Sequence, residues 1–159
     1  MNWQALPIGI GIFIALAWLR PSHDVPRGPQ VQLMVAHNAP EEVRLKKRGN
    51  GHFYVHGMVN GQIVEFMVDT GASGIVLTVA DAERVGLPVD RRRWQVIGSG
   101  ASGPVQGQVD RLDSVEVEGR TVTNLDAMVA VGLRQSLLGQ DFLRRFGSVR
   151  MSRDQMVLG

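Results

Sequence analysis

The sequence of 159 residues contains no cysteine. A disulfide framework, a zinc site built from thiolates and a cysteine nucleophile are therefore excluded, whereas an oxidising compartment is not. Aromatic residues are also few, at 6% of the chain, but hydrophobic residues make up 44%. A chain of this length and composition can bury the core of one ordinary globular domain.

Most of the chain also lacks an excess of positive or negative charge. Residues 1–48 contain six Lys or Arg and three acids, while residues 49–159 contain eleven and twelve. A surface that follows a phosphate backbone needs clustered cations, preferably with stacking aromatics. We therefore expect no nucleic-acid partner.

The one long apolar run occupies residues 5–19, with Trp3 and Trp18 near its ends, as in a membrane segment with interfacial anchors. No Lys or Arg precedes the run, and the residues after it form a poor signal-peptidase site, which favours a retained anchor over a cleaved signal. Residues 1–20 are therefore predicted to be an N-terminal membrane helix that serves as an anchor or, alternatively, as a signal.

Residues 21–48 contain four prolines and the charge run Arg44–Arg48, without sustained periodicity. This composition is typical of a linker. We therefore expect the folded domain to occupy residues 49–159.

Within that domain the pattern is mainly β. Residues 52–59 alternate between apolar and polar, and Asn60-Gly61 is a strong hairpin signal before residues 62–69. Two short helices are predicted, at residues 78–88 with Thr78 as N-cap, and at residues 139–146. The remaining predicted strands are residues 93–97, 105–112, 114–119, 120–125 and 126–131, and the chain closes with a hairpin at residues 148–159.

The first chemical motif is Asp69, which comes directly after the apolar run Val64–Val68 and is followed by Thr70, Gly71, Ala72 and Ser73. Asp-Thr-Gly alone is a common turn sequence. Here a second apolar strand follows at once, and the small residues let the backbone bend sharply around the carboxylate. This context predicts an acid on a rigid loop at the end of a buried strand.

A second motif, Leu137-Leu138-Gly139 before a helix, follows about 70 residues later. The order of hairpin, Asp-Thr-Gly-Ala-Ser, Gly-rich hairpin, apolar-apolar-Gly and helix resembles the retropepsin-like aspartic proteases over about residues 51–159. It is especially similar to short bacterial members with an N-terminal membrane segment. The resemblance implies a single closed β-barrel, equivalent to half of an acid protease.

The resemblance also implies roles for individual residues. Asp69 matches the catalytic aspartate, and Gln140 stands where many viral relatives have Arg, so an ion pair through that Arg is not assumed. Asp141 is then interpreted as structural. Support of the active-site loop is implied for Thr70, Gly71, Ser73, Leu137, Leu138 and Gly139.

A third motif, Gly98, Gly100 and Gly103, matches a dinucleotide-binding pattern letter for letter. That pattern requires a helix after the glycines, whereas Pro104 is followed by strand-like valines. We therefore expect no nucleotide. By resemblance, the flexible tip of a protease flap is assigned to Gly100, Ala101, Ser102 and Gly103.

No metal or cofactor is expected. His52 and His56 could share one face of a strand, but two imidazoles without a third ligand make a poor zinc site.

Peptide hydrolysis by carboxylates needs a pair that shares one proton, because one acid cannot both activate water and polarise the carbonyl. None of the seven other aspartates in residues 49–159 follows an apolar strand into Asp-Thr-Gly or Asp-Ser-Gly. The partner carboxylate must then come from a second copy, which predicts a homodimer. Two functions remain open: an aspartic endopeptidase that hydrolyses protein or peptide substrates, and a catalytically silent module that dimerises or binds peptides.

The sequence gives two opposing indications of the side of the membrane on which the domain lies. Arg20 and Arg27 follow the apolar run, which weakly favours a cytoplasmic domain by the positive-inside rule. The resemblance favours the opposite side. We expect a single-pass protein of the bacterial inner membrane with a periplasmic catalytic domain.

Overall fold

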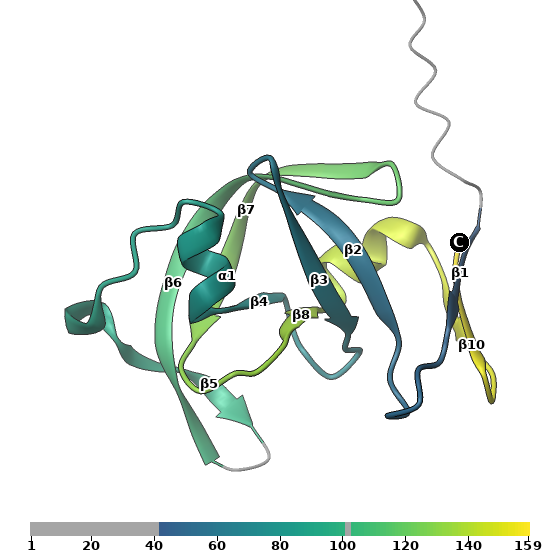
Figure 1. Cartoon of the computed structure of the whole chain (residues 1–159), viewed down its shortest axis with the longest axis horizontal. Helices are drawn as coiled ribbons and strands as arrows, with labels where there is room; N and C mark the ends of the chain where they lie inside the picture. The colour runs from purple at the N-terminus through teal and green to yellow at the C-terminus, as the bar shows by residue number, and fades with distance from the viewer. Residues whose placement is uncertain (1–41, 101–102) are drawn as a thin grey trace, which may run out of the picture. The chain divides into compact units, whose positions relative to one another are not determined.

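The computed structural model describes residues 42–100 and 103–159 (Figure 1). The predicted membrane segment, most of the predicted linker and the flap residues Ala101 and Ser102 lie outside the described residues. Within the described part no helix has the length and apolar character that a membrane crossing requires.

The described residues form two sheets, so the prediction of a mainly β domain is confirmed. Neighbouring strands in the larger sheet are β2 (Tyr54–Val59), β3 (Gln62–Val68), β8 (Ser136–Leu138), β4 (Ile75–Thr78), β7 (Arg120–Ala130), β6 (Gly103–Val117) and β5 (Gln95–Gly100). Strand β6 also pairs with β2, through Met58↔Glu116 and Val59↔Val115. This extra pairing closes the first six strands into a barrel, with β5 outside it as the partner of β6.

The β2–β3 hairpin forms where the sequence predicts it. Val55 and Val59 are buried while His56 and Met58 are exposed, which is the expected alternation. The turn residues Asn60 and Gly61 have φ of 46° and 80°, so the hairpin needs two residues that tolerate the left-handed region. The Asn60 side chain also accepts from the amide of Asp113, at 2.9 Å, and thereby ties the turn to β6.

The long hairpin of β6 and β7 differs from the prediction of four shorter strands. The two strands pair from Gly107↔Ala130 to Val117↔Arg120. Asp113 and Asn124, which separate the apolar stretches, lie inside the hairpin, and Asn124 adopts a φ of 53°. Asparagine tolerates the left-handed region better than most residues, and regular pairing resumes beyond this position at Ser114↔Thr123.

Both predicted helices are present. Helix α1 (Val79–Arg84) begins after Thr78, whose hydroxyl accepts from the amide of Asp81 at 3.0 Å. Helix α2 (Gln140–Leu143) continues into a 3-10 turn at Arg144–Phe146. Phe142 and Phe146, fully buried, pack with ring centroids 6.2 Å apart and anchor α2 on the core.

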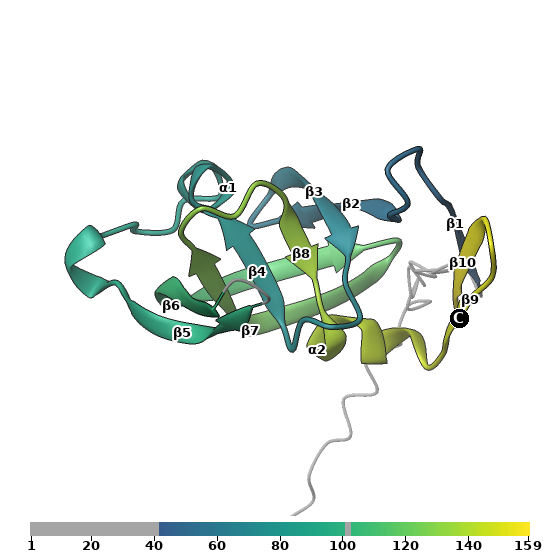
Figure 2. The ribbon, with the colours of Figure 1, turned by 90° about the horizontal axis from the view of Figure 1, so that it is seen from below.

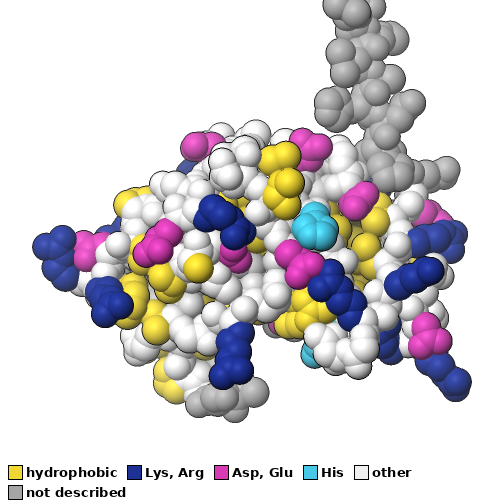
Figure 3. Space-filling view, in the orientation of Figure 1, with side chains coloured by type: hydrophobic (Ala, Val, Ile, Leu, Met, Phe, Trp, Pro, Cys, Tyr) yellow, Lys and Arg dark blue, Asp and Glu magenta, His cyan; other side chains and the backbone are white. Residues whose placement is uncertain are grey.

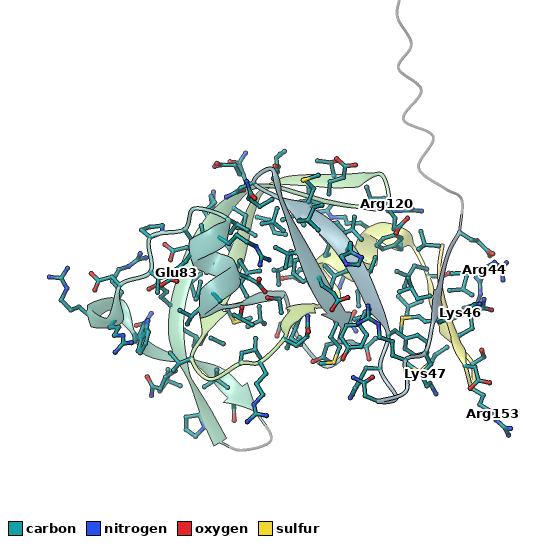
Figure 4. The ribbon with its side chains drawn as sticks, in the orientation of Figure 1. Arg44, Lys46, Lys47, Glu83, Arg120 and Arg153 are labelled. Carbon is teal, nitrogen blue, oxygen red and sulfur yellow. The ribbon has the colours of Figure 1, made fainter. Side chains whose placement is uncertain are left out.

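The smaller sheet corrects the predicted domain boundary. Its order is β1 (Val43–Lys46), β10 (Gln155–Leu158) and β9 (Val149–Met151), so the C-terminal hairpin pairs with residues assigned to the linker (Figure 2). Val43 and Leu45 are buried, whereas Arg44 and Lys46 project from the outer side of β1 (Figure 4). Buried apolar and exposed basic residues alternate in this segment, although its charges suggested a linker. The fold therefore includes β1, ahead of residue 49.

Basic and acidic side chains are interspersed on the face shown in Figure 3, and several form pairs. Arg93 binds Asp110 at 2.8 Å, and Arg111 binds Asp126 at 2.9 Å. The hydrogen bond from Arg48 lowers the pKa of the Glu65 carboxyl below its usual value. Ion pairs with at least one exposed partner add little to the stability of a fold, because solvent screens them. The barrel therefore depends on its apolar core and on buried hydrogen bonds.

One such buried group is Gln108 on β6, which is 1% exposed. Its side-chain oxygen accepts from the amide of Asp90 at 2.9 Å, and its amide donates to the carbonyl of Pro88 at 2.8 Å. The same amide contacts Asp110. Through these hydrogen bonds, Gln108 holds the segment before β5 against the barrel.

Replacing Gln108 should destabilise the fold more than replacing its exposed neighbour. Gln108→Leu leaves the Asp90 amide and the Pro88 carbonyl without this partner, so the free energy of unfolding should fall by about 3 kcal/mol. Gln106→Leu, at an exposed position of the same strand, should change it by less than about 0.5 kcal/mol. Urea unfolding measures the free energy of unfolding of both variants. Equal losses would show that the hydrogen bonds of Gln108 do not stabilise the fold.

Candidate active site

Asp69 lies directly after the last residue of β3, at a point where three strands meet. Strand β8 pairs in parallel with β3, through Val68↔Leu138, and antiparallel with β4, through Val76↔Leu137 (Figure 2). The amide of Asp69 donates to the carbonyl of Leu138 at 3.0 Å. Since β8 lies between β3 and β4, it fixes both ends of the loop that carries the carboxylate.

Two backbone amides inside the loop donate to Asp69. The amide of Gly71 donates to Oδ1 of Asp69 at 2.8 Å, and the amide of Ala72 donates to the carbonyl of Asp69 at 3.2 Å. Asp69 is half-buried, while Thr70 and Ser73 are exposed. The loop thus presents one carboxylate, held by a backbone hydrogen bond, at the rim of the barrel.

The start of helix α2 donates hydrogen bonds to the loop that carries Asp69. The amide of Gln140 donates to the carbonyl of Ala72 at 2.9 Å, and the amide of Asp141 donates to the carbonyl of Ser73 at 2.8 Å. The side chain of Gln140 reaches the carbonyl of Thr70, also at 2.9 Å. Three loop carbonyls are therefore bound by two consecutive residues.

Gly139 makes this approach possible. A Cβ at this position would lie 2.3 Å from the carbonyl oxygen of Gly74 and 2.6 Å from that of Ala72. Both are backbone atoms, so no side-chain movement can relieve the overlap. The glycine in Leu-Leu-Gly is required by close contact between two backbone segments.

A cavity of about 520 Å³ opens beside Asp69. Gly71, Ala72 and Ser73 line it on the loop side, and Gly98, Ser99 and Gly100 line it on the β5 side. The rest of the lining is largely apolar: Val76, Ile97, Val105, Met128, Ala130, Leu133 and Leu137. One carboxylate therefore faces a pocket suited to apolar side chains.

The predicted flap corresponds to the β5–β6 hairpin, in which Gly100 pairs with Gly103. Gly100 lines the cavity, and Gly103 begins β6 with a φ of 108°. Ala101 and Ser102 lie outside the described residues. Residues 103–117 form a strand, so the glycine pattern does not open the helix that a dinucleotide site requires.

The apolar wall of the cavity was not identified from the sequence. The wall includes one residue from each of three strands: Val76, Met128 and Leu137. The local sequence does not tell which residues of these strands line the cavity beside Asp69. The bond from the Gln140 side chain was also missed. Among the described residues, no group of three His, Asp or Glu is arranged to hold a metal ion.

Comparison with known proteins assigns this arrangement to a family. The model of the gag-polyprotein putative aspartyl protease family matches residues 55–145. A crystal structure of a retropepsin-like aspartic protease from Rickettsia conorii is 34% identical, covers 74% of this chain and 89% of its own, and has a TM-score of 0.62. The EIAV protease in complex with an inhibitor is 23% identical over 62% of this chain and 91% of its own, with a TM-score of 0.52, and shows the fold alone.

Two further relatives are known by sequence. An uncharacterized protein of Rickettsia prowazekii (strain Madrid E) is 36% identical over 118 residues, which are 74% of this chain and 51% of that protein. An uncharacterized protein of a Sinorhizobium species, encoded in the cobV 5′ region, is 38% identical over 120 residues, which are 74% of this chain and 52% of that protein. The chain thus spans about half the length of these two relatives.

Gly139→Ala should damage the loop severely. The added methyl group overlaps two backbone carbonyls, so we expect a loss of about 3 kcal/mol or more in the free energy of unfolding. Gly49→Ala is the matched control, because a Cβ there meets nothing within 4 Å. Thermal unfolding followed by circular dichroism compares the two. Equal melting temperatures for the two variants would contradict the close approach at Gly139.

Proposed function

Since this chain belongs to the retropepsin-like aspartic proteases, we propose that it hydrolyses peptide bonds with two Asp69 carboxylates, one from each chain of a homodimer. The substrates are proteins or peptides. The observation that carries the proposal is the single carboxylate of Asp69, held by Gly71 beside a largely apolar cavity.

The chemistry requires two carboxylates in different protonation states. The ionised one takes a proton from the attacking water, and the protonated one polarises the scissile carbonyl. Two negative charges about 4 Å apart repel by roughly 4 kcal/mol at an effective dielectric constant of 20, so the pair holds one shared proton. No covalent intermediate with the enzyme is needed.

The second carboxylate is not supplied by the described part of the same chain. Asp69 is the one carboxylate among the described residues that line the cavity. Other aspartates bind elsewhere: Asp81 contacts Ser136 and Arg84, Asp90 contacts Arg92, Asp110 contacts Arg93, and Asp126 contacts Arg111. A two-fold axis between two copies of the Asp69 loop would bring identical carboxylates together.

We also propose that residues 1–20 anchor the protein in the bacterial inner membrane, with the protease domain in the periplasm. The apolar run at residues 5–19 supports the anchor. Arg20 and Arg27 oppose this orientation only weakly, because a long domain can translocate despite a few charges.

Asp69→Asn should abolish cleavage of a peptide library by the full-length chain in detergent, while the fold and the dimer persist. Asparagine keeps the size of the side chain but cannot share the proton. A statine-type transition-state inhibitor should block the wild type. Residual activity within threefold of wild type would reject Asp69 as the catalytic acid, and an inactive wild type that still binds peptides would favour the silent module.

Mixing wild-type and Asp69→Asn chains tests the origin of the second carboxylate. Mixed dimers hold one functional carboxylate, so activity should fall as the square of the wild-type fraction once subunits exchange. A linear fall would mean that each chain works alone.

Protease added to spheroplasts tests the membrane orientation. A periplasmic domain should be degraded while the inner membrane is intact, because nothing shields it from the added protease. A cytoplasmic marker protein, which should survive, serves as the control. A domain that stays protected until the membrane is lysed rules out the periplasm.

A further inference from the structure

The peptide unit between Thr70 and Gly71 carries hydrogen bonds on both of its sides. Its N–H, from Gly71, donates to Oδ1 of Asp69 at 2.8 Å. Its carbonyl, from Thr70, accepts from Nε2 of Gln140 at 2.9 Å. Because a peptide unit is planar and its C=O and N–H point in opposite directions, a donor that fixes the carbonyl also fixes the direction of the N–H.

The Gln140 side chain binds a part of the loop that the backbone amides of Gln140 and Asp141 do not bind. The amides of Gln140 and Asp141 bind the carbonyls of Ala72 and Ser73. Thr70 is exposed, so its peptide unit is not held in place by burial. A hydrogen bond at a carbonyl also polarises the N–H of the same unit and strengthens the bond that it donates.

We propose that Gln140 is a positioning residue for the catalytic carboxylate: its side-chain amide orients the Thr70–Gly71 peptide so that the Gly71 N–H points at Asp69. This inference rests on the proposed proteolytic function. Gln140 acts on the carboxylate through a peptide unit and does not line the substrate cavity. Its loss should therefore lower kcat and leave KM nearly unchanged.

Gln140→Met tests this, because methionine keeps the length of the side chain and removes the donor. We expect kcat to fall about fivefold, in line with the loss of one hydrogen bond, with KM within about twofold of wild type. In full-length chain labelled with nitrogen-15 glycine, the Gly71 amide proton should move upfield and exchange faster. Gln140→Lys, which restores a donor, should recover the Gly71 signal.

Gln135→Met is the matched control. The Gln135 side chain donates to the carbonyl of Glu65 in β3, at 2.6 Å, and so also binds a backbone carbonyl 70 residues away. The hydrogen bond to the Asp69 carboxylate comes from Gly71 and not from that peptide unit. The control should leave kcat and the Gly71 amide signal unchanged even if it lowers stability.

The outcomes separate this inference from the proposed function. An unchanged Gly71 signal in Gln140→Met, or an equal change in Gln135→Met, would overturn the positioning role. A wild-type chain that cleaves nothing would reject the protease, while the Gly71 signal would still decide whether Gln140 orients the peptide. A rise in KM with constant kcat would assign Gln140 to substrate binding instead and overturn the proposal.

Discussion

The contact of two backbone segments at Gly139 is the constraint on which the site depends. Strand β8 lies between β3 and β4, and the chain must then turn into α2 directly beneath the loop that carries Asp69. The loop carbonyls of Gly74 and Ala72 occupy the space that any Cβ at residue 139 would need. With glycine there, the amides of Gln140 and Asp141 reach the loop, and a flexible Asp-Thr-Gly segment becomes a fixed one.

A fixed loop matters because carboxylate chemistry depends on position. The Gly71 amide, the half-buried Asp69 and the apolar cavity wall are all set by elements that meet at one end of the barrel. A carboxylate on a mobile loop would spread over many orientations, and two such loops could not bring their charges together in a reproducible geometry. A fixed loop in each chain is therefore a condition for the proposed dimer.

The small β1–β10–β9 sheet shows how local composition can hide a strand. Arg44, Lys46 and Lys47 give residues 43–47 the appearance of a charged linker, yet Val43 and Leu45 are buried against the core. Strand β10 supplies the partner, but it lies more than one hundred residues later in the chain. A short alternating segment is recognisable as a strand only when its partner is known.

The sequence by itself determined the elements whose cause is local. Asn60-Gly61 specifies a tight hairpin because both residues tolerate positive φ, Thr78 begins α1 because its hydroxyl binds an early amide, and the Asp-Thr-Gly context marks the acidic loop. The tertiary structure decided the rest: that β6 and β7 run through Asp113 and Asn124, that Met128 and Leu137 line the cavity beside Asp69, and that Gln140 binds Thr70. These features depend on which strands become neighbours. Contacts between residues about 70 positions apart follow from the packing of the whole barrel, which a local pattern does not contain.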